Sequence, residues 1–191
     1  WQSLNGDWKF NWVPNPEERP KDFYKTELDV SGWDNIPVPS SWNIYGIQKD
    51  GSQKYGTPIY VNQPVIFQHS VKVDDWRGGV MRTPPANWTT YKDRNEVGSF
   101  RRDFEIPQDW DGREVFISFD GVDSFFYLWI NGQYVGFSKN SRNAANFNIT
   151  PYLQKGKNTV AAEVYRSSDG SFLEAQDMFR LPGIFRTVAL Y

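Results

Sequence analysis

The chain has 191 residues, enough for one sizeable hydrophobic core, and a net charge of −2, which gives no long-range attraction to nucleic acid or to an anionic membrane surface. No apolar run approaches the roughly 18 residues of a membrane-spanning helix, so no membrane partner is expected. Cysteine is absent and His69 is the one histidine, which excludes disulfides, thiolate or histidine-rich metal sites and a cysteine nucleophile.

The first third of the chain holds two short segments with strand character. Residues 8–12 alternate aromatic with polar side chains, which predicts a half-buried strand. Residues 36–42 carry Pro37 and Pro39, and because proline cannot donate a hydrogen bond to a sheet ladder, they favour an edge strand or an irregular segment. Between the two, residues 14–23 are expected to contain a turn.

A long excursion is expected at residues 73–97, where Gly78-Gly79, Pro84-Pro85 and many polar residues leave only weak periodicity. The segments on either side, residues 67–73 and the chain from Phe100 onward, are predicted to join the same sheet system. We therefore expect a single domain over residues 1–191, with a long loop or insertion at 73–97.

Residues 98–106 form one of the clearest predicted strands. Alternation places Phe100, Phe104 and Ile106 on one face, because successive side chains of a strand point to opposite sides. Arg102 falls on that same face, so the core must accommodate its guanidinium group.

The later strands are bounded by turn signals. Residues 114–120 and 158–165 have strand character, and residues 125–130 are almost wholly apolar, as in a strand covered on both faces. Asn131-Gly132 follows that apolar run directly and is a strong hairpin signal. A last strand is expected over residues 184–191.

Helical patterns are scarce, whereas strands recur at intervals of roughly 8–12 residues. This organisation predicts an all-β fold, and a jelly-roll β-sandwich is the natural closed arrangement for so many antiparallel strands. Aromatic residues make up 17 % of the chain. Large core residues of a β-protein explain most of them, and stacking against a ring-shaped ligand such as a sugar is the functional alternative.

Residues 169–186 are the most chemically suggestive stretch, because Glu174 and Asp177 stand three residues apart among aromatic side chains. A retaining glycosidase needs two carboxyl groups about 5–5.5 Å apart, and a helical turn would bring such residues close. Gly170 and Pro182-Gly183 leave room for no more than a turn. The residues alone leave three alternatives open: a catalytic pair, one acid that binds a sugar hydroxyl or a cation, and a polar loop.

Other motifs point to structural roles. No glycine-rich phosphate-binding motif is present, so nucleotide binding is disfavoured. His69 stands beside Ser70 without a Gly-x-Ser-x-Gly motif, which favours a structural or surface histidine. The acidic residues 109–112 end in glycine and are read as a turn that leads into a strand.

Five blocks in family order, spanning nearly the whole chain, resemble the N-terminal sugar-binding domain of bacterial β-galactosidases of glycoside hydrolase family 2. They are residues 4–10, 38–42, 57–62, 119–124 with 129–132, and 168–180 with 183–186. The Gln-Asp-Met-aromatic-Arg block at 176–180 favours β-galactosidases over the related β-glucuronidases and β-mannosidases. Residues 138–142 keep the family's Ser-Arg pair but carry Asn140 where an acidic residue or glycine is common.

The resemblance implies a galactose-binding-domain-like jelly roll, which agrees with the strand pattern. It also implies that the catalytic acid and nucleophile are two glutamates in an α/β barrel outside this chain, so no catalytic residue is expected here. Asp177 resembles the family's aspartate that holds galactose hydroxyls and a sodium ion, and Asn62 resembles an asparagine that contacts the substrate. An ionised carboxylate suits hydroxyl donors and a hard cation, and an amide both donates and accepts.

The expected partners are a β-galactoside substrate and the catalytic barrel and other domains of the same polypeptide, in an intact enzyme that is a homo-oligomer. Sodium is expected only in the intact enzyme, because Asp177 supplies a single ligand, and no magnesium ligands are represented. Trp1 and the apolar residues 187–191 make both ends look cut, which predicts a domain excised from a longer bacterial enzyme of cytoplasm or periplasm.

Three alternatives stay open. The chain can be a stand-alone carbohydrate-binding module, a family 2 domain that serves another β-glycoside such as a glucuronide or mannoside, or a scaffold in which Asn62 and Asp177 have no role. If the chain is a stand-alone carbohydrate-binding module, the isolated chain must bind galactose. If it is one domain of an enzyme, the isolated chain is expected to bind galactose weakly or not at all, because the polar contacts and walls supplied by the rest of the active site are missing.

Overall fold

A computed structural model describes residues 1–61, 95–174 and 178–191, and the regular secondary structure in this part of the chain is almost entirely β-strand. Helical structure there is confined to one α-helical turn, α1 (Trp42–Tyr45), and to 3-10 turns at Pro16–Glu18, Gln108–Trp110, Thr150–Tyr152 and Asp169–Phe172. The strands are β1 (Gln2–Ser3), β2 (Gly6–Val13), β3 (Asp34–Val38), β4 (Ile59–Val61), β5 (Val97–Glu105), β6 (Phe116–Phe119), β7 (Val122–Asp123), β8 (Phe125–Ile130), β9 (Gln133–Ser138), β10 (Ala145–Asn148), β11 (Lys157–Tyr165), β12 (Met178–Arg180), β13 (Gly183–Ile184) and β14 (Val188–Leu190).

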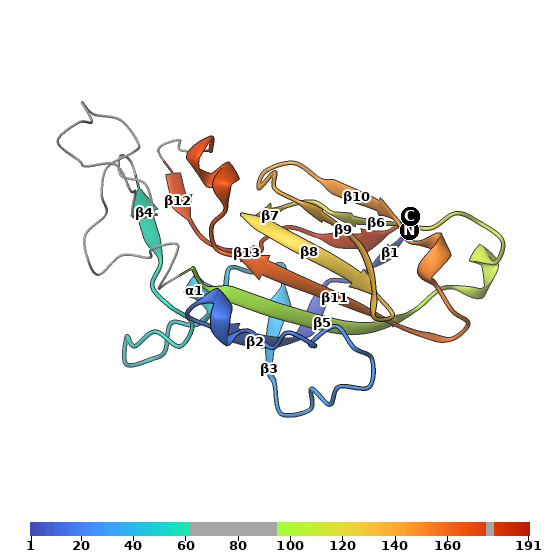
Figure 1. Ribbon diagram of the computed structural model, residues 1–191, viewed down its shortest axis with the longest axis horizontal. Helices are drawn as coiled ribbons and strands as arrows, with labels where there is room; N and C mark the ends of the chain where they lie inside the picture. The colour runs from blue at the N-terminus through green and yellow to red at the C-terminus, as the bar shows by residue number, and fades with distance from the viewer. Residues whose placement is uncertain (62–94, 175–177) are drawn as a thin grey trace.

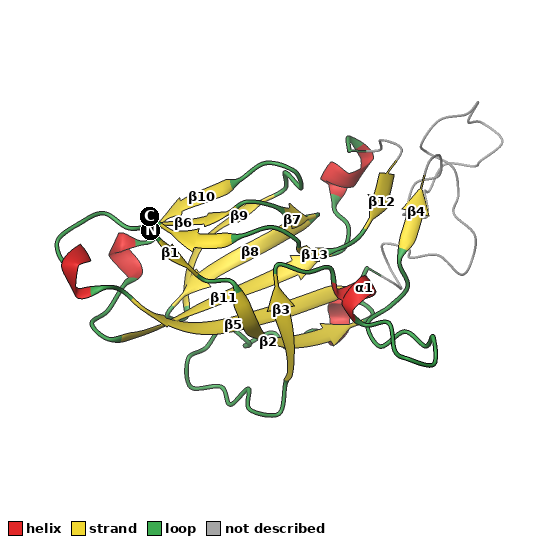
Figure 2. Ribbon diagram, turned by 180° about the vertical axis from the view of Figure 1, so that it is seen from behind, coloured by secondary structure: helices red, strands yellow, loops and turns green. Residues whose placement is uncertain are grey.

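Two antiparallel sheets form the body of the domain (Figures 1 and 2). The six-stranded sheet has the order β3-β2-β5-β11-β8-β9, and the four-stranded sheet has the order β1-β14-β6-β10. Two small ribbons, β13–β7 and β12–β4, complete the pairing. The predicted all-β sandwich is therefore confirmed.

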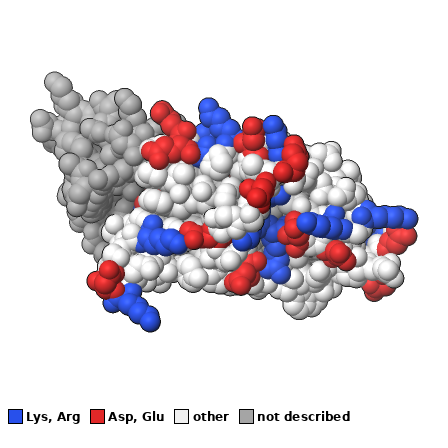
Figure 3. Space-filling view, turned by 90° about the horizontal axis from the view of Figure 1, so that it is seen from below, with Lys and Arg blue, Asp and Glu red and all other residues white. Residues whose placement is uncertain are grey.

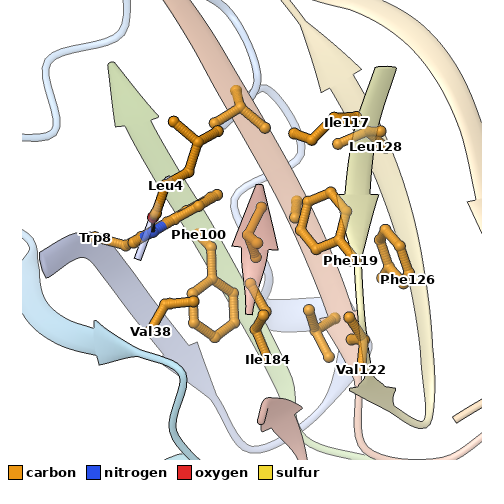
Figure 4. Packing of buried hydrophobic residues seen from close by; sticks show 14 of the residues in the cluster. Leu4, Trp8, Val38, Phe100, Ile117, Phe119, Val122, Phe126, Leu128 and Ile184 are labelled. Atoms are coloured by element: carbon orange, nitrogen blue, oxygen red, sulfur yellow. Dashed lines mark hydrogen bonds between the residues drawn. The ribbon is translucent and has the colours of Figure 1, made fainter. Parts of the chain in front are cut away.

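The hydrophobic core lies between the two large sheets (Figure 4). Trp8 and Phe100 enter it from the six-stranded sheet, Ile117 and Phe119 from the four-stranded sheet, and all four are at most 1 % exposed. The Trp8 indole N–H donates to the carbonyl of Leu4 at 2.9 Å, so burial leaves that donor satisfied. Part of the aromatic content of the sequence is thus in the core, where large rings bury large apolar areas.

Local sequence signals place several elements correctly. Asn131 and Gly132 have φ of 50° and 77° and join β8 to β9, as the Asn-Gly hairpin signal predicts. β3, which contains Pro37, is at the edge of the six-stranded sheet. The expected turn in residues 14–23 is the 3-10 turn Pro16–Glu18, capped by Asn15, whose side-chain oxygen accepts from the Glu17 and Glu18 amides.

Other boundaries differ from the predictions. The expected strand over residues 184–191 is two strands, β13 and β14, because the chain changes its pairing partner from β7 to β6. The excursion expected at 73–97 ends earlier, since β5 begins at Val97 and Asn95 and Glu96 are buried. Most of that excursion and the strand expected over residues 67–73 lie outside the described residues.

Arg102 reaches the rim of the core face of β5, where its guanidinium group donates to the backbone carbonyls of Asn5 and Asp7 at 3.1 and 3.3 Å. Hydrogen bonds to backbone oxygens help the sandwich to accommodate this charge. The same strand still buries Phe100 and Phe104, as the alternation predicts.

The segment between β2 and β3, residues 14–33, covers part of the outer face of the six-stranded sheet. Arg101 of β5 donates to the Leu28 carbonyl at 3.0 Å, and the Tyr24 ring stacks on Trp129 of β8 at 5.1 Å between centroids. β8 is therefore covered on both faces at its Trp129 end. On the neighbouring strand β9, Tyr134 and Phe137 are 50 % and 52 % exposed.

The molecular surface carries mixed charge. On the face shown in Figure 3, acidic and basic side chains are interspersed, which agrees with the small net charge of −2. Within the described residues, none of the helices has the length and apolar character needed to cross a membrane.

Candidate functional site

A two-stranded ribbon, β4 with β12, stands at the end of the sandwich away from the two termini (Figures 1 and 2). Its register pairs Arg180 with Ile59 and Met178 with Val61. Asn62 follows Val61 in the sequence and Asp177 precedes Met178, and both predicted site residues lie outside the described residues. Each of the two predicted site residues is therefore the sequence neighbour of one member of the Val61–Met178 pair.

A buried ionic network lies at the base of β4. The Glu96 carboxylate pairs with Arg166 at 2.5 Å, and their side chains are only 7 % and 1 % exposed. The same carboxylate accepts from the Trp42 indole N–H at 3.0 Å and from the Asn43 amide at 3.2 Å. Arg166 also donates to the Thr57 carbonyl at 2.9 Å, two residues before β4 begins. This network ties the approach to β4 to the ends of β5 and β11.

The base of β12 is fixed by backbone contacts. The Trp42 amide donates to the Pro182 carbonyl at 3.1 Å, and the Ser40 amide donates to the Ile184 carbonyl at 2.8 Å. Gly183, between them, has φ of +136°, and a Cβ placed there would lie 2.6 Å from the Ser40 carbonyl oxygen. Glycine is required at this position because an L side chain fits neither the backbone conformation nor the space.

A second group of charges packs beside β12. Asp123 of β7 is 3 % exposed and lies 3.3 Å from the Arg142 guanidinium. Burial raises the pKa of the Asp123 carboxyl to about 6, although the positive charges of Arg142 and Arg180 oppose that rise. Arg180 of β12, which donates to the Glu174 carbonyl, has a lowered pKa because it too is buried. The cluster links β12 to β7 and to the β9–β10 loop.

Glu174 is engaged inside the domain. Its carboxylate accepts the Ser141 backbone N–H at 3.0 Å and also the Ser141 hydroxyl. The nearby Asp169 forms an exposed ion pair with Lys139 at 2.9 Å. Of the three alternatives for the acids in this stretch, Glu174 fits the polar loop, because its carboxylate oxygens accept from Ser141.

The described residues contain no cluster of three or more histidine, cysteine, aspartate or glutamate side chains arranged to hold a metal ion. Asp177, the one residue expected to bind sodium, lies outside this part of the chain, as does His69. The acidic residues 109–112 overlap the 3-10 turn Gln108–Trp110 and end at Gly112 with φ of +76°, in agreement with their reading as a turn.

Sequence reasoning missed both charged networks. Glu96 was read as part of a long loop, and no local pattern connects it with Arg166, 70 residues later. Arg142 belongs to the Ser-Arg pair that residues 138–142 keep from the family pattern, and this was the one available signal for its position. Asp123 is within one of the five blocks of resemblance, but nothing in its neighbours indicates that it is buried.

The hollow beside the exposed Phe137 ring of β9 is a second candidate surface. It is lined by Phe137, Lys139, Asn140, Asp169, Leu173 and Glu174, among other residues. Leu173 is 85 % exposed there, and the Phe125 ring packs behind Phe137 at 5.9 Å between centroids. Aromatic rings next to donors and acceptors are the usual components of a sugar-binding surface.

Solved structures share this architecture. A β-glucuronidase of Bacteroides uniformis matches 99 % of the chain with a TM-score of 0.64 at 23 % identity, and an uncultured Clostridium β-glucuronidase matches 99 % with a TM-score of 0.65 at 18 % identity. The chain covers 17 % and 28 % of those proteins. At such identities the likeness establishes the fold alone, which is a β-sandwich.

Sequence comparison gives the family. The model of the sugar-binding domain of glycosyl hydrolases family 2 matches residues 1–191, and the chain belongs to this family. It is 42 % identical over its whole length to a β-galactosidase of Priestia megaterium and 38 % identical to a β-galactosidase large subunit of Lactobacillus helveticus. The chain spans only 16 % and 29 % of the lengths of these relatives.

Proposed function

We propose that the chain is the sugar-binding domain of a retaining β-galactosidase that hydrolyses terminal β-D-galactosides. The observation that carries this proposal is the identity of 42 % to a β-galactosidase over the whole chain, whereas the β-glucuronidase structures reach 23 %. Catalytic groups are supplied by domains of the same polypeptide outside this chain, and the chain alone has no hydrolase activity. The intact enzyme is a homo-oligomer.

In this proposal, Asn62 and Asp177 contact the substrate. The pairing of Val61 with Met178 supports it, because these two paired residues are the sequence neighbours of Asn62 and Asp177. The Asp177 carboxylate accepts from sugar hydroxyls and supplies one oxygen to a sodium ion, and the Asn62 amide donates and accepts. Both groups orient the sugar and take no part in proton transfer.

The test is hydrolysis of an aryl β-galactoside by the full-length polypeptide, with Asp177→Ala and Asn62→Ala beside the wild type. Loss of substrate positioning is expected to lower kcat/KM by roughly 10- to 100-fold in the Asp177 variant and less in the Asn62 variant. Asp111→Ala is the matched control, since Asp111 is exposed and follows the 3-10 turn Gln108–Trp110 at the opposite end of the sandwich (Figure 1). Equal activity of wild type and Asp177→Ala would favour the scaffold alternative.

The proposed sodium ligand is tested separately, by the dependence of activity on sodium. If Asp177 provides a sodium ligand, activity of the wild type rises when sodium replaces potassium at constant ionic strength, and the Asp177→Ala variant loses that dependence. The substrate class is checked in the same assay with aryl β-glucuronide and β-mannoside. Cleavage of one of these in place of the galactoside would keep the family and overturn the proposed substrate.

A stand-alone carbohydrate-binding module is the second candidate function, favoured by the exposed Tyr134 and Phe137 rings. Titration of the chain with galactose and β-galacto-oligosaccharides, followed by NMR, measures this directly. Binding that is lost in Phe137→Ala and kept in Phe116→Ala, which removes a ring of similar exposure from the other sheet, would support it. Absence of binding at millimolar sugar leaves the enzyme-domain proposal in place.

A further inference from the structure

A hollow of about 550 Å³ opens on the outer face of the six-stranded sheet, beside the segment between β2 and β3. Residues 26–31 of that segment contribute one wall. The floor comes from three neighbouring strands, with Lys9 of β2, Arg101 and Asp103 of β5, and Thr159 of β11. No residue of β4 or β12 lines it, so the hollow is separate from the ribbon end of the domain.

Two positive charges stand next to each other on this floor. Strand register pairs Lys9 with Arg101, and side chains at paired positions point to the same face of a sheet. Like charges at such positions destabilise a sheet. Within the described residues, neither charged group has a carboxylate oxygen within 4.0 Å. The Lys9 ammonium donates to the Ser31 carbonyl at 3.4 Å, which leaves two of its three N–H donors for another acceptor.

Arg101 is the more deeply placed of the two, with only 5 % of the residue exposed. Its guanidinium donates to the neutral carbonyls of Leu28 and Thr26, at 3.0 and 3.5 Å. Among the described residues, its buried Nε atom has no acceptor. Burial lowers the pKa of Arg101, and the negative charges of Asp103 and Glu27 only oppose that decrease. Buried donors without a partner commonly mark the position of an ordered water or an ion.

The carboxylates that line the hollow already accept from donors of the chain. Asp103 accepts from the Thr159 hydroxyl at 2.7 Å and pairs with Lys157 at 2.8 Å. Asp29 accepts from the backbone N–H and the hydroxyl of Ser31, at 2.8 and 3.0 Å. The unused hydrogen-bonding capacity is therefore on the cationic side chains, and a ligand that fits must supply acceptor oxygens.

From these contacts we infer that the hollow is a binding site for an oxyanion, held by Lys9 and Arg101 from neighbouring strands. A phosphate, sulfate or carboxylate group brings several acceptor oxygens and negative charge, so it satisfies the donors and relieves the repulsion between the two cations. The volume is in the range of small-molecule pockets, about 300–1,000 Å³, so the group can be a free ion or part of an acidic sugar. This site does not depend on the proposed hydrolysis of galactosides.

The test is calorimetric titration of the full-length polypeptide with sodium phosphate at constant ionic strength, because salt screens exposed charges. The wild type is expected to bind phosphate, and Lys9→Gln is expected to raise the Kd by at least about 10-fold, since a hydrogen bond to a charged group is lost. Lys9→Glu should abolish binding. Lys9 is replaced in preference to Arg101, because the Lys9 side chain has the single bond to Ser31 to lose.

The matched control is Lys54→Gln. Lys54 is a half-exposed lysine that pairs with Asp34 at 2.8 Å and does not line the hollow, so this variant removes the same charge elsewhere on the domain. Its Kd for phosphate should equal that of the wild type. Equal weakening in Lys9→Gln and Lys54→Gln would show a diffuse effect of net charge and would overturn the inference.

Two further titrations identify the source of the oxyanion. Glucose 6-phosphate and galacturonate are compared with inorganic phosphate, and tighter binding of either sugar assigns the site to a sugar that carries the group. The phosphate titration is also repeated with saturating galactose, and an unchanged Kd is expected. Loss of phosphate binding in galactose would place the ion in the active site and overturn the inference, as would the absence of binding by all three probes. Neither failure affects the hydrolysis assay, which depends on other residues.

Discussion

Replacing Arg166 with methionine should be among the most destabilising single changes in this chain. Arg166 is 1 % exposed at its side chain and pairs with Glu96 at 2.5 Å. Methionine fills much of the same volume but leaves the Glu96 carboxylate buried without its cationic partner. The Thr57 carbonyl also loses the hydrogen bond that it accepts from Arg166 at 2.9 Å.

The size of the effect follows from these contacts. Removing one partner of a buried ion pair typically costs about 3–5 kcal/mol, because the remaining charge stays desolvated. The Trp42 and Asn43 donors, at 3.0 and 3.2 Å, still reach Glu96 and compensate only part of the lost charge. For a domain of this size, each kcal/mol lowers Tm by about 2–4 °C, so a decrease of roughly 6–20 °C is expected.

The assay is urea unfolding of the 1–191 chain, followed by tryptophan fluorescence, with thermal melts in parallel. Lys157→Met is the matched control, because Lys157 pairs with Asp103 at a similar distance of 2.8 Å while their side chains are 67 % and 51 % exposed. An exposed pair contributes about 0–1 kcal/mol. A loss below about 1 kcal/mol in Arg166→Met, or equal losses in the two variants, would show that burial does not decide the strength of these pairs.

Two further predictions concern Asp123 and Gly183. The Asp123 carboxyl has a pKa of about 6 in the folded chain against about 4 when unfolded, so the folded chain binds more protons between these pH values and its free energy of unfolding falls as pH rises through them. Relative to Asp123→Asn, wild type should therefore lose about 3 kcal/mol across this window in urea unfolding; a constant difference would contradict the raised pKa. Gly183→Ala should destabilise by at least about 2 kcal/mol more than Gly112→Ala, because both have positive φ but only the Cβ at Gly183 meets backbone, at 2.6 Å. Equal losses in the free energy of unfolding for the two alanine variants, measured by the same method, would show that the Ser40 backbone moves to make room for the added Cβ.

Where a structural feature depends on neighbouring residues, the sequence predicts it well. Asn131-Gly132 marks the β8–β9 turn because both residues adopt positive φ there. Pro37 predicts an edge strand because it lacks a donor for a second neighbour, and β3 has only β2 beside it. The scarcity of helical periodicity likewise suffices for the all-β class.

Features that depend on distant contacts could not be predicted in this way. Alternation along β5 puts Arg101 on the face opposite the core, but its burial depends on the backbone of Leu28, 73 residues earlier. The division of residues 184–191 depends on where β6 ends and β7 begins. The Asp120 amide donates to the Thr187 carbonyl at 2.9 Å, and the chain between the two ladders is too irregular to continue as one strand.

The candidate site shows the same limit. Asn62 and Asp177 were found by resemblance to a family, and the spacing of Glu174 and Asp177 left several chemistries open. The contact between Glu174 and Ser141, 33 residues apart, favours an internal role for Glu174, and no local pattern contains it. Likewise, the pairing of Val61 with Met178 depends on strand register, which alternation within each short strand does not specify.

The two buried ionic networks have a common geometry that explains their position. Arg166 donates to the Thr57 carbonyl just before β4, and Arg180 donates to the Glu174 carbonyl just before the stretch that leads into β12. Buried ion pairs are a poor source of stability compared with apolar packing, which the core between the sheets already supplies. Hydrogen bonds to backbone carbonyls near each strand of the ribbon fix the direction of that strand better than apolar contacts do, because hydrogen bonds depend on geometry. The charges at this end of the sandwich therefore serve the orientation of the β4–β12 ribbon more than the cohesion of the domain.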